Sequence, residues 1–199
     1  MATPGTAPVT FPTKITARSQ SMKAQLAAAN NFRPFIEAAA QQFGFQPCII
    51  CGIGSRESGW GLLLKPPGPG GTGDRARRKP KPPLRPGSLP PDGQGFGRGL
   101  MQIDFDSNVL AQTGNWRDPQ TNINFGCDLL AQKLAFVKKH SKLEGLMLLR
   151  GAIAAYNCGE GAVCKLAEEG LDIDSKTTGR DYSADVLNRA GFFQQNGWA

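Results

Sequence analysis

The sequence lacks the long apolar run of roughly 18 residues that a transmembrane helix needs. It also lacks a heptad or Gly-X-Y period, so coiled-coil and collagen-like architectures are excluded. Its N-terminus has no apolar stretch of the secretory type. We therefore expect that a signal has been removed, that the chain is a domain of something longer, or that export uses another route.

Acidic residues are too few to balance the basic ones, since 16 Asp and Glu stand against 23 Lys and Arg and leave a net charge of +7. With 40% hydrophobic and 20% charged residues, the chain is too apolar to be disordered and is able to bury a core over most of its length. The 199 residues fit one domain, with or without a tail. The positive charge points to a polyanionic partner, which is nucleic acid, anionic lipid or an acidic cell-wall polymer.

The charge is concentrated in one proline-rich segment. Residues 65–91 hold nine of the fifteen prolines, and positions 65–86 carry seven Lys and Arg against Asp74 alone. No regular element survives such a density of proline, so the segment is predicted to be a long loop. Because the rest of the chain is nearly neutral, overall basicity no longer argues for nucleic acid. We expect the basic residues at 75–85 to form either a solvated, mobile loop or a binding site for anionic wall polymers.

Cysteines are few and odd in number, which argues against a disulfide scaffold. The five are Cys48, Cys51, Cys127, Cys158 and Cys164. The pair at positions 48 and 51 has no second CxxC to complete a zinc site, and His140 is the single histidine. Buried, reduced thiols are therefore preferred over a metal site.

Helical periodicity predicts most of the remaining elements. Residues 1–29 are expected to form an N-terminal segment, here called the lead-in, that is poorly ordered or peripheral. Gly93–Gly99 predicts a glycine-dense turn or hairpin, and a P-loop is excluded because no Gly-Lys-Ser/Thr follows. Helices are predicted from residue 31 to a stop at Gly44, from Pro47 through about residue 61, and over 100–110, 119–140, 143–156 and 182–194.

Glu57 is the first candidate for chemistry. It shares a helix face with Ile50 and Ile53, so its carboxylate is expected to be desolvated, with a raised pKa suited to a general acid. The alternative is that Glu57 has a structural role, in an ion pair with Arg56 or Arg98. Glycoside hydrolysis also needs a second carboxylate across a cleft. The candidates in or next to the glycine-rich segment are Asp74, Asp92, Asp104 and Asp106.

Five motifs between about residues 30 and 197 occur in the order seen in goose-type lysozymes, which this chain resembles. They are SRES at 55–58, GLMQID at 99–104, NINFG at 122–126, AAYNCGEG at 154–161 and TTGRDYSADV at 177–186. The resemblance implies a mostly α-helical, lysozyme-like α+β domain over 30–199, with a short β-hairpin by the cleft and a basic, proline-rich insertion at about 65–91.

The resemblance also implies cleavage of the β-1,4 bond between N-acetylmuramic acid and N-acetylglucosamine in peptidoglycan. By position, Glu57 resembles the general acid, and Asp104 resembles one of two aspartates that activate the attacking water, which gives inversion. The residues that match the substrate-binding positions are Gln102, Tyr156, Asn157 and Tyr182. No metal or cofactor is implied. Peptidoglycan glycan strands are the expected partner, and a proteinaceous lysozyme inhibitor is a further candidate partner.

The second water-holding aspartate is where the sequence departs from the family pattern, which places it seven residues before the Leu of LMQ. Here that position is Gly93. Asp92 lies eight residues before Leu100 and is preferred for its proximity. Asp74 follows a glycine, as in the family, but would require an insertion.

Two other readings remain open. Lytic transglycosylases share the E-S, G-L-M-Q-I and A-Y-N-x-G motifs and cleave the same bond without water. Asp104 favours hydrolysis, unless it caps the helix after it. The third reading is a non-catalytic wall-binding module. The site of action is the cell wall, reached by secretion, in the periplasm or by a route without a signal peptide.

Overall fold

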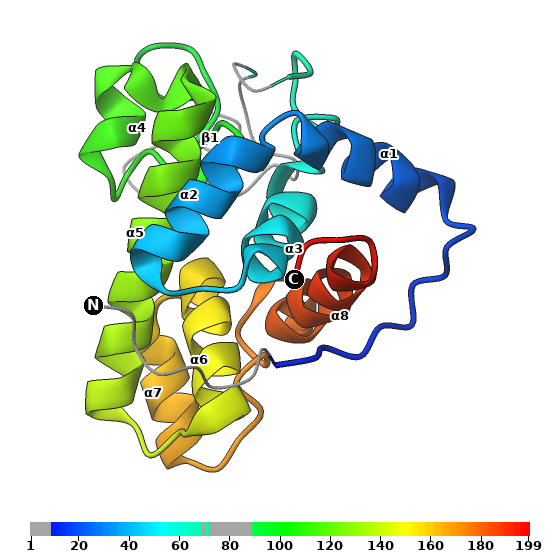
Figure 1. Ribbon diagram of the computed structural model, residues 1–199. Coiled ribbons are helices and arrows are strands. Elements are labelled where there is room, and N and C mark those ends of the chain that lie inside the picture. Colours follow the sequence, from blue (N-terminus) through cyan, green and yellow to red (C-terminus); the bar gives the residue numbers. More distant parts are fainter. Residues whose placement is uncertain (1–8, 69–70, 72–88) are drawn as a thin grey trace.

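The structure, a computed structural model, describes residues 9–68, 71 and 89–199 (Figure 1). The elements in chain order are α1 (Gln20–Asn30), α2 (Arg33–Phe43), α3 (Pro47–Ser58), β1 (Gly97–Arg98), β2 (Ile103–Asp104), α4 (Val109–Thr113), η1 (Asn115–Arg117), α5 (Pro119–His140), α6 (Gly145–Cys158), α7 (Glu160–Glu168), η2 (Thr178–Arg180) and α8 (Tyr182–Gln195). In these ranges the strands form one two-stranded sheet, which confirms the mostly α-helical α+β class. Asp74 and the basic residues 75–85 lie outside the described residues.

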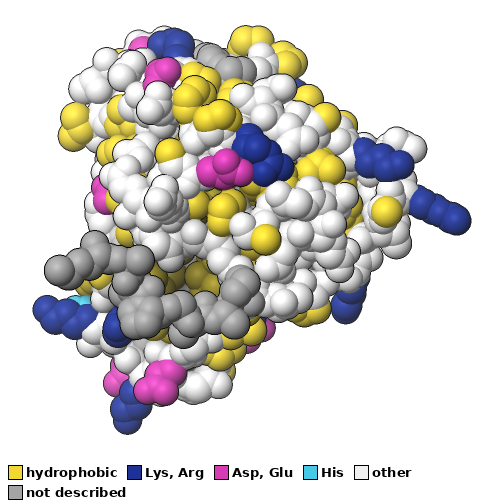
Figure 2. All heavy atoms as spheres, viewed as in Figure 1, with side chains coloured by type: hydrophobic (Ala, Val, Ile, Leu, Met, Phe, Trp, Pro, Cys, Tyr) yellow, Lys and Arg dark blue, Asp and Glu magenta, His cyan; other side chains and the backbone are white. Residues whose placement is uncertain are grey.

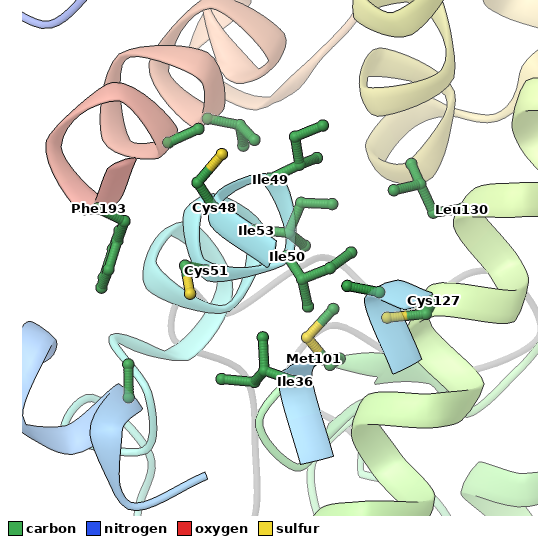
Figure 3. Packing of buried hydrophobic residues seen from close by; sticks show 14 of the residues in the cluster. Ile36, Cys48, Ile49, Ile50, Cys51, Ile53, Met101, Cys127, Leu130 and Phe193 are labelled. Carbon is green, nitrogen blue, oxygen red and sulfur yellow. The ribbon is translucent and has the colours of Figure 1, made fainter. Parts of the chain in front are cut away.

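Helix α3 runs through the centre of the core. Every residue from Cys48 to Ser55 is buried, as expected for a helix that is apolar all round rather than along one stripe. Figure 3 shows its isoleucines in one cluster with side chains of α2, α5 and α8. Gly52 allows close packing against α8, because a Cβ there would lie 2.5 Å from the carbonyl oxygen of Val186. Because α3 is held in the centre of the core, the position of its last turn, which carries Glu57, is fixed.

Several helix boundaries confirm the predictions. Helix α2 stops at Gly44, whose φ of 74° is left-handed. Helix α5 begins after Asp118, whose side chain accepts a hydrogen bond from the Thr121 amide. Helix α8 begins at Tyr182 and covers the predicted range.

The predicted helix over 100–110 is wrong. Strands β1 and β2 pair antiparallel, with Gly97 opposite Asp104 and Arg98 opposite Ile103, so the LMQID segment forms a turn and a strand. Gly99 has a φ of 70°, and a Cβ there would lie 2.4 Å from Asn122 Nδ2. The backbone therefore turns where the apolar spacing alone favoured a helix. The hairpin expected in the glycine-rich segment is confirmed, but its second strand lies beyond that segment.

Two further differences concern helices that the pattern did not predict. Helix α6 extends to Cys158, and Gly159, with φ 86° and ψ 147°, separates it from α7. At the N-terminus, α1 forms where a poorly ordered or peripheral lead-in was expected, and Met22 and Ala29 are buried. Phe11 is 2% exposed, and its amide donates to Gln194 Oε1 at 2.9 Å. The described part of the lead-in therefore packs on the domain.

The cysteines are free thiols. Cys48, Cys51 and Cys127 are buried, and burial raises the pKa of Cys48 and of Cys127 to about 12. Cys158 and Cys164 are half-buried. The prediction of buried thiols is thus confirmed for three of the five cysteines.

Charged side chains are scattered on the face drawn in Figure 2, where the coloured Lys and Arg residues form no continuous basic patch. This agrees with a nearly neutral domain outside residues 65–86. None of the helices in the described ranges combines the length and apolar content that crossing a membrane requires.

Candidate active site

A cleft of about 760 Å³ brings together the end of α3, the β-hairpin, the middle of α5, the end of α6 and the start of α8. Its lining residues are Arg56, Glu57, Gly97, Gln102, Ile103, Asp104, Ser107, Asn108, Leu129, Gln132, Lys133, Ala155, Tyr156, Asn157, Cys158, Gly159, Thr178 and Tyr182. The candidates Glu57 and Asp104 therefore share one cleft with all four predicted substrate-binding residues.

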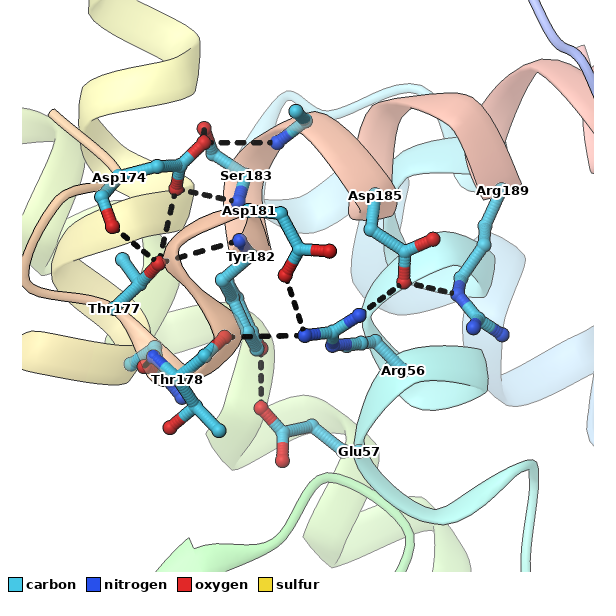
Figure 4. Close-up of polar contacts among 12 residues, drawn as sticks. Arg56, Glu57, Asp174, Thr177, Thr178, Asp181, Tyr182, Ser183, Asp185 and Arg189 are labelled. Carbon is cyan, nitrogen blue, oxygen red and sulfur yellow. Dashed lines mark hydrogen bonds and ion pairs between the residues drawn. The ribbon is translucent and has the colours of Figure 1, made fainter. Parts of the chain in front are cut away.

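Glu57 stands in the last turn of α3, where it is half-buried. The Tyr182 hydroxyl donates a hydrogen bond to Glu57 Oε1 (Figure 4). Burial raises the pKa of Tyr182 well above its ordinary value, and the Glu57 carboxylate adds to this shift. The phenol thus stays protonated at neutral pH and holds one carboxylate oxygen in place.

Asp174 fixes the start of α8 and so the position of Tyr182. Its side chain is 1% exposed and accepts hydrogen bonds from the Ser183 amide at 2.8 Å, the Ser183 hydroxyl at 2.7 Å and the Ala184 amide at 3.2 Å. It also pairs with Arg150 at 3.0 Å. Burial alone would raise the pKa of Asp174, but the hydrogen bonds from Ser183 and Arg150 lower it overall.

Replacing Asp174 with asparagine is expected to destabilise the protein by about 2–3 kcal/mol at neutral pH, because buried donors lose a charged acceptor. An Asp whose pKa is lowered by folding stabilises the protein above its unfolded pKa of about 3.9. This contribution is lost as the pH falls through the folded value. Urea unfolding at neutral and acidic pH should therefore show a difference between the Asp174→Asn variant and the wild type that shrinks in acid.

The matched control is Asp172→Asn, since Asp172 is 68% exposed and lies 3.9 Å from the same Arg150 guanidinium. It should change the free energy of unfolding by less than about 1 kcal/mol. Equal effects of the two substitutions, or a difference that does not depend on pH, would contradict the role of Asp174.

Arg56 ties the last turn of α3 to α8 (Figure 4). Its guanidinium pairs with Asp185 at 2.6 Å and Asp181 at 2.9 Å, and donates to the Thr178 carbonyl at 3.1 Å. Arg189 pairs with the same Asp185 carboxylate at 2.7 Å. Although burial alone would raise the pKa of Asp185, these two arginines lower it overall. Arg56, which precedes Glu57 in the chain, is thus held in place by ion pairs. The sequence pattern did not predict this structural role.

Three side chains from different helices hold the hairpin turn. The Ser58 hydroxyl donates to the Leu100 carbonyl at 2.7 Å, and the Tyr156 hydroxyl donates to the Met101 carbonyl at 2.8 Å. The buried Asn122 accepts from the Met101 amide at 2.8 Å. These bonds fix the turn between β1 and β2 against α3, α5 and α6.

The turn presents Gln102 and Asp104 to the cleft. Gln102 has a φ of 48°, a left-handed backbone that is uncommon for a non-glycine residue and clusters at functional sites. Asp104 accepts a hydrogen bond from the Ser107 hydroxyl at 2.7 Å. Asn108, not Asp104, occupies the N-cap of α4, so the alternative of Asp104 as a helix cap is wrong.

Asp92 lies outside the cleft that contains Glu57 and Asp104. Both of its carboxylate oxygens accept from Arg98 at 2.9 Å, and this hydrogen bonding lowers the pKa of Asp92. The Arg98 side chain is fully buried, with its guanidinium 4.8 Å from the ring of Phe105 and 5.2 Å from that of Trp116. Among the described residues, Asp92 does not line the cleft. The structure therefore brings Asp104, and not Asp92, into the cleft of Glu57.

Other lining residues were not predicted as site residues. Gln132 and Lys133 lie on α5 three and four residues after Leu129, which also lines the cleft, so helical spacing offered a signal. Ser107 comes from a turn and Thr178 begins the single-turn η2, and neither segment is long enough for a spacing rule to apply. In the described ranges, no three His, Cys, Asp or Glu side chains gather as a metal site would require.

A half-buried glutamate at the end of a central helix, in one cleft with an aspartate on a β-hairpin, is the arrangement of a lysozyme-type glycoside hydrolase. The family model described as Lysozyme g matches residues 89–197. The chain is 33% identical to lysozyme g of Takifugu rubripes over 171 residues, which cover 83% of this chain and 75% of the relative.

Two birds provide similar relatives. Lysozyme G of Dromaius novaehollandiae is 31% identical, with 87% of this chain and 71% of the relative covered. Lysozyme g of Gallus gallus is 32% identical, with 87% of this chain and 68% of the relative covered. The chain belongs to the lysozyme g family and is a glycoside hydrolase.

Proposed function

We propose that the protein hydrolyses the β-1,4 bond between N-acetylmuramic acid and N-acetylglucosamine in peptidoglycan, with Glu57 as the general acid. The observation that carries this proposal is the placement of Glu57 and Asp104 in one cleft, with Tyr182 donating to Glu57. Membership of the lysozyme g family supports the same substrate.

In the proposed reaction, Glu57 gives its proton to the glycosidic oxygen as the bond from that oxygen to the anomeric carbon breaks. Asp104 accepts a proton from a water molecule whose oxygen attacks the anomeric carbon from the opposite face. One water is consumed and the configuration at that carbon inverts. Gln102, Tyr156 and Asn157 bind the sugars on either side of the bond.

The second water-holding aspartate has two candidates. Asp92 keeps its favourable position in the sequence, but its ion pair with the buried Arg98 favours a structural role. Asp74 lies outside the described residues and remains the alternative. Binding of anionic wall polymers by the basic residues 75–85 likewise remains a prediction.

The product of wall digestion tests the reaction type. Hydrolysis of purified peptidoglycan leaves a reducing-end muramic acid, whereas a lytic transglycosylase leaves a 1,6-anhydro sugar. Mass spectrometry should find the reducing product with its added water. Muropeptides that carry only anhydro ends would show that Glu57 works without the water that Asp104 is proposed to activate.

A further inference from the structure

Lys133, on α5, lines the cleft, and the proposed reaction does not use it. Of the described residues that line the cleft, Lys133 and Arg56 are the two that carry positive charge. The Arg56 guanidinium is already held by two carboxylates, from Asp181 and Asp185, and its side chain is 16% exposed. The Lys133 side chain is 25% exposed, so Lys133 is the cation that the cleft offers to a ligand.

The Lys133 ammonium donates to Glu160 Oε2 at 2.5 Å, which is its one hydrogen-bond partner among the residues that the structure describes. An ammonium has three N–H donors, so two remain for a ligand and the pair with Glu160 need not break. Glu160 begins α7 directly after Gly159, which lines the cleft. The hydrogen bond from Lys133 lowers the pKa of Glu160, so the glutamate stays charged and holds the ammonium where α5 borders the cleft.

The substrate of the proposed reaction carries an acid group that suits this ammonium. N-acetylmuramic acid differs from N-acetylglucosamine by a lactyl ether, whose carboxyl group is either free or joined to a peptide with carboxylates of its own. Such carboxylates are ionised at neutral pH. The Asp104 carboxylate in the same cleft repels them, whereas the Lys133 ammonium attracts them.

We propose that Lys133 binds a carboxylate on the lactyl substituent of N-acetylmuramic acid, and that Glu160 orients Lys133 for this contact. Lys133 is then a specificity-determining residue, because it distinguishes a strand that contains muramic acid from a polymer of N-acetylglucosamine alone. The class of strand is that of the proposed function, on which this role of Lys133 rests.

Calorimetric titration in a Glu57→Gln background, which slows turnover, measures this contact. The probes are a peptide-free strand with free lactyl carboxylates, the same strand with these groups converted to neutral amides, and a strand that carries stem peptides. Lys133→Gln should weaken binding of at least one of the two charged strands about three- to tenfold and change binding of the amidated strand less than about twofold. A loss confined to the peptide-free strand assigns the contact to the lactyl carboxylate, and a loss confined to the peptide-carrying strand assigns it to the peptide.

Glu160→Gln separates ligand binding from a purely structural ion pair. Both substitutions remove the same ion pair between α5 and α7, so a structural role predicts equal losses for every strand. Carboxylate binding by Lys133 instead predicts that Glu160→Gln keeps or raises the affinity for the charged strands, because the ammonium remains and the glutamine oxygen still accepts from it. Lys133→Arg, which keeps the charge, should bind the charged strands within about threefold of the parent protein.

The matched control is Lys165→Gln, since Lys165 is 75% exposed, pairs with Glu169 at 3.8 Å and is not among the described cleft residues. It should change none of the affinities, and thermal unfolding should show that all variants remain folded. Unchanged affinity of Lys133→Gln for both charged strands, an equal loss for the amidated strand, or equal losses in Glu160→Gln would overturn the role of Lys133. Failure of the wild type to cleave walls would instead overturn the proposed function, since the titrations measure affinity alone.

Discussion

Glu57→Gln is expected to lower the rate of peptidoglycan cleavage by about 10²–10⁴-fold, because the amide has no proton to give to the glycosidic oxygen. The amide oxygen keeps an acceptor for the Tyr182 hydroxyl, so the cleft should retain its shape. Turbidity clearing of purified walls measures the rate, and co-sedimentation with the walls measures binding, which should change little.

The control for this substitution is Glu37→Gln, a surface glutamate that is 49% exposed and pairs with Arg33. It should clear walls at the wild-type rate. Clearing by the Glu57→Gln protein within a few-fold of the wild type would show that another group protonates the leaving oxygen.

Asp104→Asn and Asp92→Asn are expected to have opposite signatures. Loss of the Asp104 carboxylate should reduce wall cleavage by about 10²-fold or more, because the base that activates the water is gone. Loss of the Asp92 carboxylate should instead destabilise the fold by about 1–3 kcal/mol, since the buried Arg98 loses its counter-ion. The lower part of that range is favoured because the Asp92 side chain is 38% exposed and solvent screens the pair.

Chemical denaturation and wall-clearing rates, measured on both variants at a temperature where both are folded, separate these signatures. A stable but inactive Asp92→Asn protein would make Asp92 the second water-holding aspartate. An active Asp104→Asn protein would remove Asp104 from the proposed reaction and favour the transglycosylase reading.

The sequence correctly predicted helix ends, because these depend on residues that are neighbours in the chain. Gly44 ends α2 because it adopts a left-handed backbone, and Asp118 begins α5 because its carboxylate caps the helix. The hairpin strand at Ile103–Asp104 was missed, since it depends on Ser58, Tyr156 and Asn122, which bond to the turn from distant helices. Apolar spacing carries no information about such contacts.

The same holds for the candidate site: features that depend on neighbouring residues were predicted, and features that depend on contacts between distant residues were not. Glu57 was found from its place on an apolar helix, and the cleft indeed contains it. Asp92 was preferred over Asp74 for its distance along the chain, but the pairing of Asp92 with Arg98 depends on the burial of that arginine between Phe105 and Trp116. Asp174 was not predicted at all, because it bonds to Ser183 and Ala184 at the start of α8 and pairs with Arg150 on α6, and sequence spacing does not show that these groups meet.

The stereochemistry of the product tests the central claim most directly. Proton NMR recorded during digestion of soluble glycan strands resolves which anomer of the new reducing sugar forms first, before mutarotation mixes the two. Glu57 as acid with water activated by Asp104 predicts the α-anomer first from the β-linked substrate. Initial release of the β-anomer, or of a 1,6-anhydro sugar, would contradict that account.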